Sequence, residues 1–138
     1  MQHSDLNLLK RVRKQRCLRA EREYSKHRHD LALFAQKIDN QRAELQQLTI
    51  NCQQGRASLG RQHQGAQISF QRLKEWQQKE SELLNRMSAK SEEISSLQQQ
   101  CEEQSKQVES ARVALKQQQL SMEKLEELTR ILNEEALL

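Results

Sequence analysis

Residues 55–65 read GRASLGRQHQG and contain all three glycines of this 138-residue chain, Gly55, Gly60 and Gly65. Each glycine inside a helix costs about 1 kcal/mol relative to alanine. The chain contains no proline, so no other stretch carries a comparable helix-breaking signal. The sequence therefore predicts one turn at about residues 55–65, between a helix over about residues 5–54 and a second helix over about residues 66–136.

A narrow apolar stripe runs along each predicted helix. In the second helix, a heptad repeat with Leu73 at position a and Trp76 at position d continues without a phase break to Ala136. In the first helix, the same three- and four-residue spacing links Tyr24 to Cys52. A narrow stripe is buried only against a partner stripe, and the nearest partner is the other helix.

We therefore expect an all-α fold, a long antiparallel two-helix coiled-coil hairpin. The hairpin forms a single elongated domain over residues 1–138. With the turn at residues 55–65, the second helix extends past the start of the first by about twenty residues.

One alternative fold is a single continuous helix in a parallel dimer, because the heptad phase continues across the glycines with Leu59 and Ala66 at position a. The charge pattern favours the hairpin. Residues 1–30 hold nine basic and four acidic side chains, a net charge of +5, whereas residues 101–138 hold five basic and eight acidic ones, a net charge of -3. An antiparallel hairpin places the basic start of the chain beside Glu102, Glu103 and Glu109, whereas a parallel dimer stacks like charges.

Several seam positions of the predicted coiled coil are polar. Such residues either fix the register of the two helices or mark a place where a third surface docks. These positions are Gln41, Glu80, Lys90, Gln104 and Gln118. The three cysteines, Cys17, Cys52 and Cys101, all fall at position a, and we interpret them as small apolar seam residues.

Composition and motifs argue against most other functional classes. A two-helix hairpin has no interior pocket for catalytic groups, so we expect no enzyme, no catalytic residue and no cofactor. His27 and His29 lie two residues apart and point to different sides of a helix, so we expect no metal site.

No apolar run approaches the roughly 20 residues that span a membrane, and Met1 to Lys10 lacks the apolar core of a secretory signal. The chain is therefore expected to be cytosolic and not inserted into a membrane.

A basic run, LKRVRKQRCLRAER, occupies residues 9–22. Its positive charges cover more than one face of a helix and would attract an acidic partner. No aromatic residue lies within residues 1–23 to stack on bases, and no nucleic-acid-binding motif accompanies the run, so we expect no nucleic-acid partner. A solvated face is the alternative interpretation of this run. Anionic lipid is a further candidate partner, although the apolar side of the run is weak for insertion, and an acidic ring of protein subunits is as good a partner.

The stretch from Leu6 to Tyr24, with its pattern L-x-x-L-K-R-V-R-K-x-R-x-x-R-A-E-R-E-Y, precedes a proline-free helical hairpin rich in Gln and Glu. This arrangement resembles the FliJ/YscO family, the coiled-coil stalk proteins of flagellar and virulence type III secretion. The resemblance extends over nearly the whole chain and is one of residue pattern more than of a fixed motif.

The resemblance implies a role in protein transport as the central stalk of a type III secretion ATPase. The paired N- and C-terminal helices would enter the pore of the ATPase hexamer and stimulate or couple ATP hydrolysis. The other end of the hairpin would contact the cytoplasmic ring of the export gate, and export chaperones are possible further partners. The resemblance thus places the chain in the cytoplasm, at the base of the secretion apparatus.

The resemblance also implies two sets of binding residues. The residues expected to bind the ATPase are Arg11, Arg13, Lys14, Arg16, Arg19, Glu126, Glu127 and Arg130. The residues expected to bind the export gate are Tyr24, Leu31, Phe34, Phe70 and Trp76. The alternative function is a generic dimeric coiled-coil tether, a structural protein with no ATPase partner. Seam filling is the alternative role of the aromatic residues.

Overall fold

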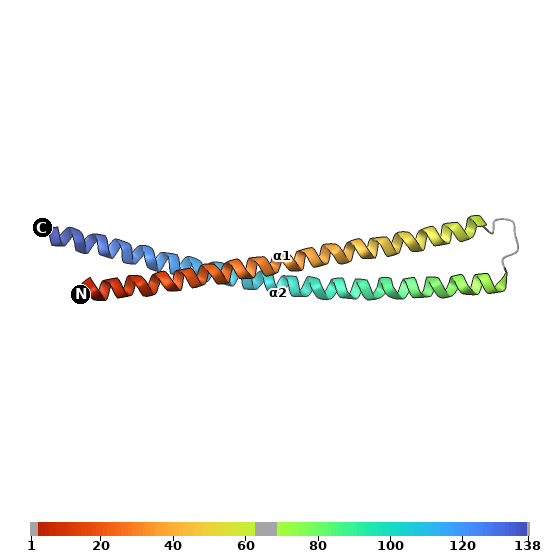
Figure 1. The fold of residues 1–138 in the computed structure, drawn as a ribbon, viewed down its shortest axis with the longest axis horizontal. Coiled ribbons are helices and arrows are strands. Elements are labelled where there is room, and N and C mark those ends of the chain that lie inside the picture. Colours follow the sequence, from red (N-terminus) through yellow and green to blue (C-terminus); the bar gives the residue numbers. More distant parts are fainter. Residues whose placement is uncertain (1–2, 63–68, 138) are drawn as a thin grey trace. The chain divides into compact units, whose positions relative to one another are not determined.

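The computed structural model describes residues 3–62 and 69–137 and is all-α, with no strand in these two ranges. Helix α1 spans His3–Gln62 and helix α2 spans Phe70–Leu137 (Figure 1). The two helices pack against each other in antiparallel orientation. The predicted antiparallel two-helix hairpin is therefore confirmed.

The hairpin divides into two units, and each unit contains a segment of both helices. We call Met1–Leu33 together with Glu102–Leu138 the terminal unit, and Phe34–Cys101 the inner unit. The first part of α1 and the last part of α2 therefore share one unit, as an antiparallel hairpin requires.

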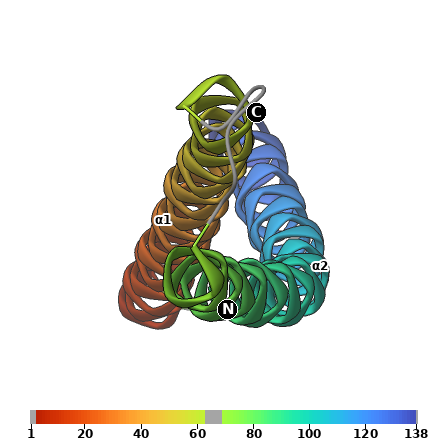
Figure 2. The same cartoon turned by 90° about the vertical axis from the view of Figure 1, so that its right-hand side faces the viewer.

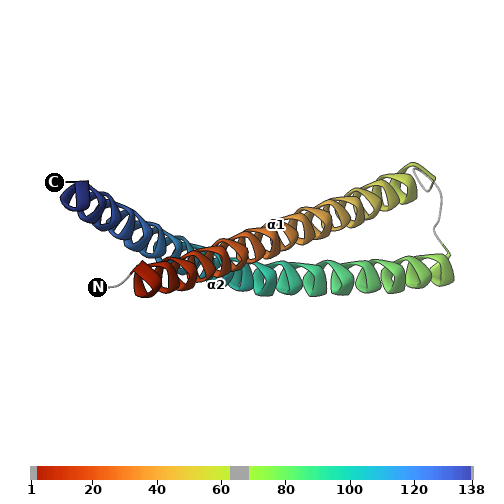
Figure 3. The ribbon, with the colours of Figure 1, turned by 60° about the vertical axis from the view of Figure 1, so that its left-hand side comes forward.

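The terminal unit pairs the first part of α1 with the last part of α2, drawn in red and blue in Figure 3. Two polar contacts set the register of this unit. The Nη1 atom of Arg13 donates a hydrogen bond of 2.8 Å to the main-chain carbonyl of Ser121. The Nε2 atom of Gln104 donates a hydrogen bond of 3.0 Å to the carbonyl of His27. Later residues of α1 therefore contact earlier residues of α2, as in an antiparallel pair of helices. The buried apolar residues of this unit are Leu6, Cys17 and Leu125.

The inner unit contains the end of α1 and the beginning of α2 (Figure 2). Arg56 of α1 donates a hydrogen bond of 2.6 Å from Nε to the Glu80 carboxylate of α2. The Lys90 ammonium of α2 contacts Gln41 Oε1 at 2.7 Å and also the Glu44 carboxylate, both on α1. The buried apolar residues here are Ile38, Cys52 and Ile94.

The predicted seam is confirmed by the burial pattern. Every a and d position from Trp76 to Leu132 is buried or half-buried, and so is every such position from Tyr24 to Cys52. Leu73 and Ala136, at the two ends of the second heptad run, are exposed. The heptad period therefore identified the contact faces of both helices, because burial in a two-helix hairpin follows the local periodicity.

The predicted end of the first helix at residue 54 is wrong. Helix α1 continues through Gly55 and Gly60 and ends at Gln62. Two glycines cost a helix about 2 kcal/mol in total, and the packing of this long helix against α2 outweighs that cost. Gly65, the third glycine of the predicted turn, lies outside the described residues.

The predicted start of the second helix at residue 66 lies outside the described residues, and α2 as described begins at Phe70. Ser69 caps this end. Its Oγ atom accepts a hydrogen bond of 3.2 Å from the backbone N–H of Arg72, three residues on, which is the usual geometry of an N-cap serine. The Ser69 side chain was the sequence signal that we overlooked.

The later end of α1 and the later start of α2 change the register of the hairpin. Arg13 lies opposite Ser121, so the start of α1 lies opposite about residue 131 and α2 extends about six residues further. The expected extension of about twenty residues is therefore wrong. The eight additional residues of α1 from Gly55 to Gln62, its earlier start at His3 and the later start of α2 at Phe70 together account for most of the difference.

Polar seam residues bond across the two helices. Lys90 at position d contacts both Gln41 and Glu44, and the hydrogen bond to Glu44 raises the pKa of the Lys90 ammonium. Gln104 contacts His27, and Glu80 contacts Arg56. These pairs form only in one alignment of α1 and α2, so the structure favours the register role for these residues over a docking role.

We expect the Lys90→Met substitution to stabilise the hairpin. Methionine fills the seam position with an apolar chain of similar length, and replacing a partly buried ionic group in this way raises the free energy of unfolding by about 1 kcal/mol. Urea denaturation followed by circular dichroism measures the change. Lys79→Met, at an exposed position, is the control and should leave the free energy of unfolding unchanged. A destabilised Lys90→Met protein would contradict the prediction.

Candidate protein-binding surface

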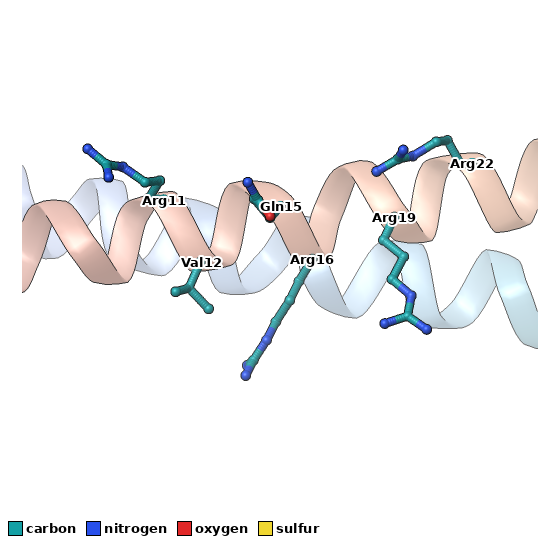
Figure 4. A pocket seen from close by; sticks show the side chains of 6 residues that line it. All are labelled: Arg11, Val12, Gln15, Arg16, Arg19 and Arg22. Carbon is teal, nitrogen blue, oxygen red and sulfur yellow. The ribbon is translucent and has the colours of Figure 1, made fainter.

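Four arginines line a shallow groove on α1 in the terminal unit. We call this the arginine groove, and its lining residues are Arg11, Val12, Gln15, Arg16, Arg19 and Arg22 (Figure 4). All six side chains are exposed. Val12, Arg16 and Arg19 point to one side of the helix, whereas Arg11 and Arg22 point to the other (Figure 4). Positive charge therefore covers more than one face of α1, as the sequence predicts.

Most charges of the arginine groove are available to a partner. Arg19 lies 3.5 Å from Glu23, and both side chains are well exposed, so this pair contributes little stability. Within the described parts of the chain, the other three groove arginines, Arg11, Arg16 and Arg22, form no ion pair. An anionic partner therefore displaces at most one weak ion pair when it binds here.

Arg13 is placed differently from the other predicted ATPase-binding arginines. It is half-buried and donates its hydrogen bond to the Ser121 carbonyl across the seam. It belongs to the contact between α1 and α2 and not to the exposed groove. Extending the heptad frame upstream from Tyr24 puts Leu6, Arg13 and Ala20 at position d, and this signal could have identified the seam role of Arg13.

The predicted binding residues of α2 lie in the same unit as the arginine groove. Glu126, Glu127 and Arg130 are exposed. Arg130 bonds to Glu127 at 2.5 Å and to Glu134 at 2.6 Å. The hydrogen bond from Arg130 lowers the pKa of Glu127, so Glu127 stays ionised to lower pH. The structure thus brings the two halves of the predicted set into one unit, with the Arg130 charge already engaged by two carboxylates.

The basic start of the chain and Glu102, Glu103 and Glu109 lie in one unit, as expected, but no ion pair joins them among the described residues. These glutamates are exposed at heptad positions b and c, which face away from the partner helix. Glu109 instead pairs with Arg112 of its own helix at 2.7 Å, which lowers the pKa of Glu109. In the described part of the terminal unit, every ion pair joins two residues of one helix.

The residues predicted to bind the export gate are divided between the two units. Tyr24 and Leu31 belong to the terminal unit, whereas Phe34, Phe70 and Trp76 belong to the inner unit. All except Phe70 are half-buried at seam positions, in agreement with the alternative that they fill the seam. Phe70 at the first turn of α2 is 81% exposed, and it is the member of this set that a partner can reach.

Several exposed apolar side chains outside the seam were not predicted from the sequence. On α1 they include Leu8 and Val12, and on α2 they include Leu120, Leu128 and Ile131. These residues occupy heptad positions b, c, f or g, outside the a and d positions on which the reading concentrated. A second apolar period on the outer face was the signal that could have identified them.

Neither α1 nor α2 has a stretch that is both long and apolar enough to cross a membrane. No cluster of three or more His, Cys, Asp or Glu side chains suited to hold a metal ion occurs in residues 3–62 and 69–137.

Comparisons with protein-family models, with curated proteins and with solved structures return no match for this chain. The resemblance to the FliJ/YscO family therefore rests on the residues from Leu6 to Tyr24 and on the helical hairpin.

Proposed function

We propose that this chain is the central stalk of a type III secretion ATPase complex and that its terminal unit enters the pore of the ATPase hexamer. The chain itself carries no catalytic group and binds no cofactor in this proposal. It stimulates or couples ATP hydrolysis in the surrounding subunits, in the cytoplasm at the base of the secretion apparatus.

The observation that supports this proposal most strongly is the pairing of the first part of α1 with the last part of α2 in one unit. This unit presents the arginine groove on α1 and exposed Glu126 and Glu127 on α2. A narrow two-helix surface with separated positive and negative charges suits insertion into a ring, because complementary charges steer encounter and fix orientation.

The asymmetry of a two-helix unit supports a coupling role. Inside a six-fold ring, some subunits would contact the basic part of α1 while other subunits contact the acidic part of α2. A ligand that contacts subunits unequally biases their conformations unequally, so hydrolysis would proceed around the ring in sequence. The export gate would contact the inner unit, with exposed Phe70 as the aromatic anchor.

A turnover assay tests the proposal. The purified chain is added to a purified hexameric type III secretion ATPase, and phosphate release is measured against chain concentration. We expect saturable stimulation at a stoichiometry of one chain per hexamer. Unchanged turnover, together with no co-migration of the chain with the hexamer, would reject the stalk and favour a structural tether.

A further inference from the structure

We propose that free copies of this chain pair through their terminal units, with α1 of one copy on α2 of a second copy. The α1 outer face consists of Leu8, Val12, Arg16 and Arg19. The α2 outer face consists of Leu120, Leu128 and Ile131 together with Glu123 and Glu135. Both faces lie in the terminal unit, and neither is part of the seam between α1 and α2.

The α1 outer face is apolar at its centre and positive at its side. Leu8 is 59% exposed and Val12 is 39% exposed. They occupy heptad positions f and c, which point away from α2. Val12, Arg16 and Arg19 project in the same direction from the helix (Figure 4). Apolar side chains surrounded by guanidinium groups are a typical composition of protein interfaces.

The α2 outer face is apolar at its centre and negative overall. Leu120, Leu128 and Ile131 are each more than 40% exposed and occupy heptad positions f, g and c. Residues 120–137 contain five glutamates against Lys124 and Arg130. The last turn of α2 contains no basic residue, so the negative end of the helix dipole has no positive side chain to offset it.

Charge complementarity identifies a second copy as the occupant. In each chain the α1 outer face is positive and the α2 outer face is negative. Two copies related by a two-fold axis therefore form two equivalent contacts, each between the α1 outer face of one copy and the α2 outer face of the other. Contact of α1 with α1 of the second copy would place arginines against arginines, which is unfavourable. The antiparallel contact of α1 with α2 repeats the orientation that the helices have within each chain.

Pairing of this kind would cover Arg16 and Arg19. If the proposed function holds, the same arginines bind the ATPase ring, so self-association and insertion into the ring exclude each other. This consequence rests on the proposed function, whereas the pairing itself does not and is measured without any ATPase.

The mass of the purified full chain tests the pairing. We expect sedimentation equilibrium at about 150 mM salt, where charges are screened beyond about 8 Å, to show a dimer that dissociates as salt is raised. The Arg16→Glu/Arg19→Glu variant should raise the dimer dissociation constant at least about tenfold. Glu123→Lys/Glu135→Lys, which leaves the contacts of Arg130 intact, should do the same.

An equimolar mixture of the two variants is the decisive sample. In a mixed pair, the reversed α1 face meets the reversed α2 face and the two native faces meet each other, so the dimer should return. Circular dichroism of each variant confirms that the helices persist. A wild-type chain that stays monomeric, variants that dimerise as well as wild type, or a mixture that stays monomeric would each overturn the proposal. A monomeric wild-type chain would assign these faces to another protein.

Discussion

The Arg16→Glu/Arg19→Glu variant is expected to lose at least about nine-tenths of its stimulation of the secretion ATPase. Both guanidinium groups are exposed in the arginine groove and project from the same side of α1 (Figure 4). Reversal of both charges turns attraction to an acidic ring into repulsion, which lowers the association rate and the affinity together. Phosphate release at increasing chain concentration measures the loss.

A matched control separates a surface effect from an effect of net charge. Arg42→Glu/Lys74→Glu changes the net charge by the same amount at two exposed positions of the inner unit, and it should stimulate the ATPase like wild type. Equal loss in both variants would show that overall charge, and not the arginine groove, drives stimulation. Arg13 is not substituted in this experiment because its hydrogen bond to Ser121 joins α1 to α2, and its loss would also affect the packing of the two helices.

Two glycines in α1 provide the second prediction, because the same substitution should have opposite effects at Gly55 and Gly60. Gly60 has nothing within 4 Å of a built Cβ, so Gly60→Ala should raise the free energy of unfolding by about 1 kcal/mol. At Gly55 a Cβ would lie 2.7 Å from Cζ3 of Trp76 and still closer to its Cη2. The indole must therefore move, and the crowding costs about 1–3 kcal/mol.

Gly55→Ala is thus expected to lose stability even though alanine is the better helix former. Urea denaturation measures both free energies of unfolding against wild type. Trp76 is the single tryptophan of the chain, so its fluorescence reports the displacement of the indole directly. Its emission should change in Gly55→Ala and remain as in wild type in Gly60→Ala. Stabilisation of both variants by the same amount would contradict the packing of Trp76 on Gly55.

Much of the candidate binding surface could be predicted from the sequence. Arg11, Lys14, Arg16 and Arg19 were predicted as binding residues and are exposed, since helical periodicity alone separates outer positions from seam positions. Arg13 was predicted as a binding residue from its positive charge, and its heptad position d accounts for its half-buried place beside Ser121. Of the predicted gate residues, all except Phe70 lie at a or d positions and are half-buried, and their binding to an export gate stays a prediction.

The sequence by itself determined that this chain is helical and which stripe of each helix is buried, from Tyr24 to Cys52 and from Trp76 to Leu132. These features depend on local periodicity and on the absence of proline. Only the tertiary structure decided where α1 ends and α2 begins, that Gly55 packs against Trp76, and that Arg13 bonds to Ser121. A glycine lowers local helix stability by only about 1 kcal/mol, and contacts between residues distant in sequence readily exceed that amount.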